Sequence, residues 1–174
     1  MRAMGKHVLA NGLNAASLRP LAKAASTSDR MLIYHFGSKD RLIAALLQHL
    51  AGEMAERLTM ALPPQKAETN RACIIEIVAL VRSAPFQGYM ALWFDVLSEA
   101  GRGQPHFAEV GGAMLGGFLG WVMQRLPEHT QDLEATAAAL LTVIEGTVVL
   151  DKVGQSAIAD RAIDRLFPAS TGDR

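Results

Sequence analysis

The chain has 174 residues, and its 17 Lys and Arg balance its 17 Asp and Glu, so its formal net charge is zero. Half of the residues are hydrophobic, which excludes an intrinsically disordered chain, and the length suits one or two compact domains. The single cysteine excludes a disulfide scaffold and a cysteine-rich zinc module, and it fits a reducing cytoplasm.

The zero net charge hides an uneven distribution along the chain. Residues 1–50 contain seven basic and two acidic residues, a local charge of +5, and the remaining residues contain ten basic and fifteen acidic ones, a charge of −5. One interpretation is that this uneven charge is chance, because the counts are small. In the other, the basic segment meets a polyanion, because lysine and arginine contacts to phosphates release counterions.

The pattern along the chain predicts helices only. Apolar residues recur every three or four positions, and proline, glycine and polar clusters interrupt them. Ser17, Ser28 and Ser38 are the expected N-caps of the second, third and fourth helices. The expected helices cover residues 2–11, 18–25, 28–35, 39–62, 66–84, 86–100, 105–126, 130–152 and 156–167.

Neither a signal peptide nor a membrane span is predicted. The first residues lack the apolar stretch of a signal peptide, and the most apolar run, at residues 110–123, is shorter than the roughly 20 residues that a spanning helix needs. We therefore expect a cytoplasmic protein with no membrane partner.

Residues 18–36, with the sequence LRPLAKAASTSDRMLIYHF, have the spacing of a helix-turn-helix. Two short helices that cross steeply need a small residue where they touch, and Ala22 meets this need, with Ser26 at the turn. The expected buried side consists of Leu21, Ala25, Leu32 and Phe36. The second helix would enter the major groove of DNA with its outward residues Asp29, Arg30, Met31, Tyr34 and His35.

This segment resembles the DNA-binding domain of the tetracycline-repressor (TetR) family. The resemblance rests on Ser17-Leu18-Arg19-x-x-Ala22, Thr27-Ser28, Leu32 and the run from Tyr34 to Leu42, YHFGSKDRL, and it is strong over residues 8–50. It implies an all-α protein with a helix-turn-helix domain at residues 1–48. A long helix would join this domain to a helical effector-binding and dimerisation domain at residues 49–174.

The resemblance also implies roles for individual residues. Arg30 and Met31 lie at base-facing positions, and Lys39 is similar to the family's phosphate-binding lysine. The implied DNA-binding set is Arg19, Thr27, Ser28, Asp29, Arg30, Met31, Tyr34, His35 and Lys39. The chain departs from the family pattern at Ser26, where glycine is usual, and at Ile33, where tyrosine is usual. It also starts later than the family's first helix, so we expect either an upstream extension of the natural protein or a trimmed start.

The second domain, by the same resemblance, binds a small molecule and forms a dimer. Large, soft apolar side chains suit a cavity for a small hydrophobic effector, although they fill a core equally well. The expected effector pocket consists of Met90, Trp93, Phe94, Phe107, Met114, Phe118, Trp121 and Glu145, with Asp95, Glu99 and His106 as further polar candidates.

The last two helices are expected to form the dimer interface, because the helix at 130–152 is apolar on more than one face. The expected interface residues are Leu133, Leu140, Leu141, Ile144, Val148, Ile158, Ile163 and Leu166. The helix at 105–126 carries five glycines, namely Gly111, Gly112, Gly116, Gly117 and Gly120. They indicate a close-packed seam, open volume for a ligand, or a break in the helix.

We find no catalytic motif. The histidines lack metal-binding spacing, the lone cysteine has no histidine at motif spacing, and no nucleotide loop follows a strand. We therefore expect no enzyme activity, no cofactor and no metal site. The predicted function is a ligand-responsive transcriptional regulator, a repressor by family default, that binds a palindromic double-stranded DNA operator as a homodimer. The alternative is an all-α small-molecule-binding protein or enzyme without a DNA-binding role.

Overall fold

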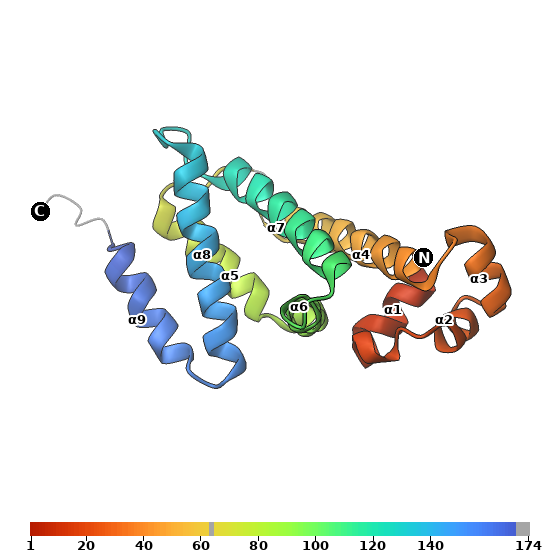
Figure 1. Cartoon of the computed structure of the whole chain (residues 1–174). Coiled ribbons are helices and arrows are strands. Elements are labelled where there is room, and N and C mark those ends of the chain that lie inside the picture. Colours follow the sequence, from red (N-terminus) through yellow and green to blue (C-terminus); the bar gives the residue numbers. More distant parts are fainter. Residues whose placement is uncertain (63–64, 170–174) are drawn as a thin grey trace, which may run out of the picture. The chain divides into compact units, whose positions relative to one another are not determined.

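The computed structural model describes residues 1–62 and 65–169, and this part of the chain contains helices and no strand. The all-α fold predicted from the sequence is confirmed. Two short 3-10 helices, η1 (Leu13–Ala15) and η2 (Ala84–Phe86), were not predicted. The α-helices are α1 (Arg2–Asn11), α2 (Leu18–Ala24), α3 (Asp29–Phe36), α4 (Lys39–Ala61), α5 (Asn70–Arg82), α6 (Gln87–Gly101), α7 (Pro105–Arg125), α8 (Leu133–Lys152) and α9 (Ser156–Leu166) (Figure 1).

Polar side chains fix where several helices begin. The hydroxyl of Ser28 accepts a hydrogen bond from the Met31 N–H at 3.2 Å, and the hydroxyl of Ser38 accepts one from the Arg41 N–H at 3.2 Å. Ser17 occupies the N-cap position of α2, but its side chain makes no capping bond. The third position of α2 is proline, which has no N–H to donate, so one of the two usual partners of an N-cap oxygen is missing.

The described chain packs as two compact units. The first comprises Met1–Arg57 and Pro85–Gly116, and the second comprises Leu58–Ala84 and the chain from Gly117 onward, so α4 and α7 each contribute residues to both. The sequence-based domain boundary at residue 48 falls inside α4 and stays a prediction about function.

In the first unit, α1, α2 and α3 surround a small core with the start of α4. Val8, Leu21, Leu32 and Leu42 are all buried in it. Helix α6 lies against α1, and a Cβ added to Gly88 would stand only 3.2 Å from the Leu9 carbonyl oxygen. Glycine at this position therefore lets the two helices approach closely.

In the second unit, α8 packs between α5 and α9, and α8 and α9 lie side by side (Figure 1). Ile77 of α5, Ile144 of α8 and Ile163 of α9 are buried in this core. Arg82 of α5 donates two hydrogen bonds to Asp151 of α8, at 2.8 and 3.0 Å, and lies 2.8 Å from an Asp160 oxygen of α9. One guanidinium thus ties the three helices together.

Helix α8 is apolar enough and long enough to cross a membrane by length and composition alone. Its mean hydropathy over 18 residues is 1.7, and 28% of that window is buried. A single helix of this kind is weak evidence for a membrane span, because a packed helix of a protein core has the same composition.

Candidate nucleic-acid interface

Helices α2 and α3 pack against each other as two arms of a helix-turn-helix (Figure 1). Ala22 is buried, with 2% of its surface exposed, which agrees with a small residue at this point of the motif. The Thr27 N–H donates to the Ala22 carbonyl at 2.9 Å, and this bond closes the turn between the helices. Leu21 and Leu32 are buried as predicted, whereas Ala25 and Phe36 are half-buried.

Ser26 adopts the left-handed backbone conformation that the turn requires, with φ at 52°. The same region favours glycine, because a Cβ crowds the following carbonyl oxygen. Among the described residues, Ser26 is the only non-glycine residue with positive φ. The departure from the family's usual glycine is therefore a site of local strain and not a different turn.

All nine side chains in the predicted DNA-binding set are exposed. Tyr34 and Met31 are the large ones, with 78% and 41% of their surfaces exposed. Both side chains are therefore accessible to a partner molecule. The set comes from α2 (Arg19), the turn (Thr27 and Ser28), α3 (Asp29, Arg30, Met31, Tyr34 and His35) and the start of α4 (Lys39).

Tyr34 lies one residue after the position at which the family usually has tyrosine. Ile33 occupies the family's usual tyrosine position and is half-buried, while Tyr34 is one residue further on and points outward. The ring of Tyr34 meets the ring of His35 edge to face, with centroids 5.4 Å apart. The two aromatic side chains therefore support each other at the outer end of α3.

Residues 7–46 match the family model described as bacterial regulatory proteins, tetR family. Residues 7–46 therefore form a DNA-binding domain of the tetR type. Among solved structures, Salmonella enterica GusR is similar in fold, with a TM-score of 0.61, 20% sequence identity, and coverage of 97% of this chain and 93% of GusR. A comparison with curated proteins gave no match. The tetR-family domain makes the chain a DNA-binding transcriptional regulator.

The residues predicted to line an effector pocket are divided between the two units of the chain. Trp93 and Phe107 are buried in the first unit, with Met90, Phe94 and Met114 half-buried there. Trp121 is buried in the second, where its indole N–H donates to the Thr59 hydroxyl at 3.1 Å and its ring stacks on Phe118. Glu145 is half-buried on α8. Their role as a pocket stays a prediction.

A pocket of about 410 Å³ lies in the first unit. Phe107 belongs to it, as do three of the further polar candidates, Asp95, Glu99 and His106. Its other wall comes from residues that sequence reasoning did not assign to a pocket, including Asn14, Ser17 and Lys39. No sequence signal joins them, because they lie on segments that only the fold brings together.

The glycines of α7 do not break the helix, which is continuous from Pro105 to Arg125. A Cβ added to Gly111 would touch the Trp93 ring at 3.6 Å. Added at Gly112, Gly116, Gly117 or Gly120, it would meet no heavy atom of the described residues within 4 Å. The predicted seam is therefore not formed by the described part of this chain at those four positions.

The predicted dimer interface needs correction. Leu140, Ile144, Val148 and Ile163 are buried within the single chain, so their side chains are not available to a partner. The apolar stripe that suggested them is the inner face of α8, which packs on α5 and α9. Leu141 is half-buried. The members that stay exposed are Leu133, Ile158 and Leu166.

Proposed function

We propose that the chain is a ligand-responsive repressor that binds a palindromic operator as a homodimer in the cytoplasm and is released by a small, largely apolar effector. The observation that carries the DNA-binding part is the exposed surface of the helix-turn-helix. Nine exposed side chains gather there, within a segment of residues 1–50 that has a net charge of +5. The set includes Arg19, Arg30 and Lys39, and such basic side chains around a recognition helix are what phosphate contacts and base reading use.

The proposed roles follow from the chemistry of each side chain. Arg30 suits the O6 and N7 atoms of guanine, and Met31 suits the methyl group of thymine. Ser28 accepts from Met31 N–H through its oxygen, and its O–H is still able to donate to a phosphate. Lys39 is exposed at the start of α4, where its ammonium group can reach the DNA backbone.

The homodimer part of the proposal is supported by an uncharged outer face of α8. Residues at spacings of three and four along this face are small or β-branched, and all are exposed. Val149 and Val153 have 48% and 67% of their surfaces exposed, which is unfavourable for apolar side chains in water. A second copy of α8 would cover them. The face consists of Ala135, Ala138, Thr142, Gly146, Val149 and Val153.

The DNA-binding proposal is tested by fluorescence anisotropy with a duplex that the wild-type chain selects from a random library. Binding should weaken steeply as salt rises, because phosphate contacts release counterions. Lys39→Ala should weaken binding. It should also make the slope of log affinity against log salt shallower by about 0.9 for each helix-turn-helix domain that binds the duplex. Lys66→Ala is the matched control, because Lys66 pairs with Glu128 outside the helix-turn-helix. Salt-insensitive or absent binding would favour the alternative of an all-α protein without a DNA role.

The homodimer is tested by sedimentation of the wild type and of Thr142→Arg. Thr142 lies in the middle of the outer face of α8 and is exposed, so an arginine there leaves the core of the chain intact. We expect a dimer for the wild type and a monomer for the variant, because two arginines would meet near the symmetry axis. The control is Arg161→Ala on α9, also exposed. A variant that still sediments as a dimer would place the interface elsewhere.

A further inference from the structure

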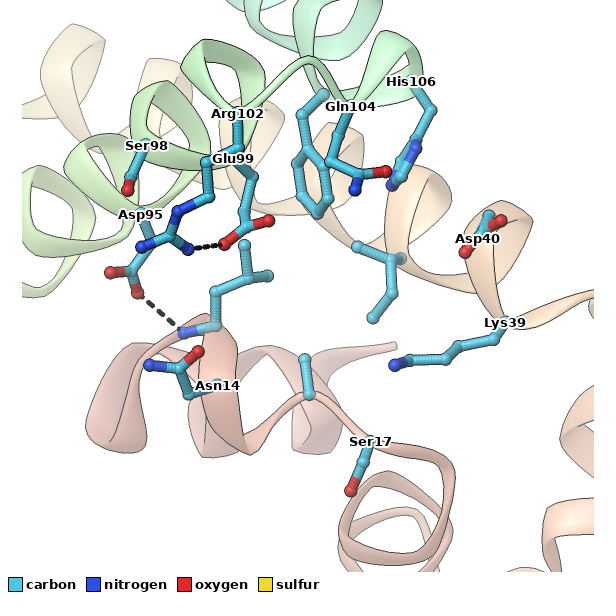
Figure 2. A pocket seen from close by; sticks show the side chains of 14 residues that line it. Asn14, Ser17, Lys39, Asp40, Asp95, Ser98, Glu99, Arg102, Gln104 and His106 are labelled. Carbon is cyan, nitrogen blue, oxygen red and sulfur yellow. Dashed lines mark hydrogen bonds and ion pairs between the residues drawn. The ribbon is translucent and has the colours of Figure 1, made fainter.

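The pocket in the first unit is built from three segments that are distant in the sequence. Asn14 and Ser17 come from the connection into α2, Lys39 from the first turn of α4, and Gln104 from the corner between α6 and α7 (Figure 2). Its volume of about 410 Å³ lies in the range of small-molecule sites. One wall of the pocket therefore belongs to the helix-turn-helix region itself.

The pocket combines an apolar base with a polar rim. Ala16, Ile43 and Phe107 line it and are 4%, 5% and 8% exposed, so they offer buried carbon surface. The rim carries the amide groups of Asn14 and Gln104, which can donate hydrogen bonds to oxygen atoms. Such a lining suits a molecule with an apolar body and one polar end.

Three of the charged groups in the pocket, Asp95, Glu99 and Arg102, already have partners. Glu99 accepts from the Arg102 guanidinium at 2.5 Å, and Asp95 accepts from the Leu13 N–H at 2.8 Å (Figure 2). The Glu99–Arg102 pair lies at the C-terminal end of α6, and the Asp95 bond joins α6 to the connection between α1 and α2. The charge of Glu99 is balanced by Arg102, and the Asp95 carboxylate is held in place by the Leu13 N–H.

Lys39 is the cation without such a partner. Its side chain extends from the start of α4 toward the pocket, and it makes no ion pair or hydrogen bond with the described residues (Figure 2). Asp40 lies at the rim, in the first turn of α4, where the helix dipole favours its negative charge. The ammonium group of Lys39 is thus the positive charge that an anionic ligand in this pocket can satisfy.

We propose that this pocket binds a small organic anion, a carboxylate with an apolar body. The carboxylate pairs with the ammonium group of Lys39, and the apolar body covers Ala16, Ile43 and Phe107. The consequence for regulation rests on the proposed function, in which Lys39 also contacts a DNA phosphate. A Lys39 side chain that turns into the pocket toward the ligand is withdrawn from the DNA backbone, so the ligand competes with DNA for this lysine.

The binding site is tested without DNA, by saturation-transfer NMR on the full chain. Benzoate is the probe, and benzamide and benzylamine are its neutral and cationic counterparts with the same ring. We expect benzoate to bind at millimolar concentration and benzamide at least tenfold more weakly, with no binding of benzylamine. Lys39→Gln should abolish the preference for benzoate over benzamide. Equal binding of benzoate and benzamide to the wild type would overturn the proposal.

The location is tested by filling the pocket. Gln104→Trp and Ser98→Trp each place an indole at an exposed rim position, from opposite sides, so at least one should fold with an unchanged circular dichroism spectrum. Both should lose benzoate binding, and Ala108→Trp, exposed on α7 outside the pocket, should retain it. Benzoate binding that survives in a folded pocket-filling variant would also overturn the proposal.

The competition is tested by anisotropy with the selected duplex. Saturating benzoate should weaken DNA binding on the order of tenfold and reduce the magnitude of the salt slope by about 0.9 per head, because one phosphate contact is lost. If benzoate binds but leaves DNA affinity unchanged, the competition is refuted while DNA binding stands. If the wild type binds no DNA at all, the proposed function fails, and the NMR experiments still decide whether the pocket takes an anion.

Discussion

Replacing Ser26 with glycine should stabilise the folded chain, because Ser26 holds a left-handed backbone that only glycine adopts without penalty. Its φ of 52° belongs to the turn between α2 and α3, and its exposed side chain has no hydrogen bond to the described residues. Nothing favourable is lost when the hydroxymethyl group is removed. The substitution therefore isolates the cost of the backbone conformation.

The size of the effect follows from two opposing contributions. A Cβ in the left-handed region costs roughly 1–2 kcal/mol per residue. Glycine gains conformational freedom in the unfolded chain, which costs roughly 0.4–1 kcal/mol. The net gain in the free energy of unfolding lies between about 0 and 1.6 kcal/mol, and its centre of about 0.8 kcal/mol raises the melting temperature of a chain of this length by about 2–3 °C.

The assay is thermal unfolding followed by circular dichroism, with all variants at one protein concentration because dimerisation would shift the melting temperature. Ser17→Gly is the matched control. Ser17 is also exposed, has a φ of −94° and makes no side-chain capping bond, so glycine relieves no strain there and should lower the melting temperature slightly. If Ser26→Gly melts at or below the temperature of Ser17→Gly, the strain argument is wrong.

Three further predictions concern single side chains. Arg30→Ala should cost about 1–3 kcal/mol of DNA-binding free energy and relax base preference at one position, measured by repeating the selection with the variant. Burial raises the pKa of Cys73 to about 11, so Ellman's reagent at pH 8 should modify it only after denaturation. Arg82 lowers the pKa of Asp151, so Arg82→Gln should melt below wild type at neutral pH, and the difference should shrink below about pH 3.9, where the carboxylate protonates.

The helices were predictable because local residues determine them. Proline and glycine end the helices where the sequence places them, and the hydroxyls of Ser28 and Ser38 cap α3 and α4 as expected. The left-handed turn at Ser26 agrees with what the family resemblance implies, because the family usually has glycine at this position. The predicted capping bond of Ser17 is missing, and the proline at the third position of α2 would have indicated this.

The partners of each helix face were not predictable from one sequence. Helical periodicity showed that α8 is apolar on more than one face, but not which face packs inside the chain. Leu140 and Ile144 were therefore assigned to a dimer interface although they lie in the core, while Val149 and Val153 on the opposite face were not assigned to it. The pocket was equally hidden, because Asn14, Lys39 and Gln104 come from segments with no shared motif.

The packing of the first unit suggests how a ligand could reach the DNA-binding surface by a short route. The α6–α7 corner, the connection into α2 and the first turn of α4 belong to one compact unit, and Asp95 bonds α6 to the backbone of Leu13. A molecule in the pocket would touch Lys39 directly. Its effect on DNA binding would therefore need no change in the separation of the two helix-turn-helix domains of a dimer. A monomeric Thr142→Arg variant would therefore retain the benzoate response in each head, whereas a mechanism based on head separation would lose it.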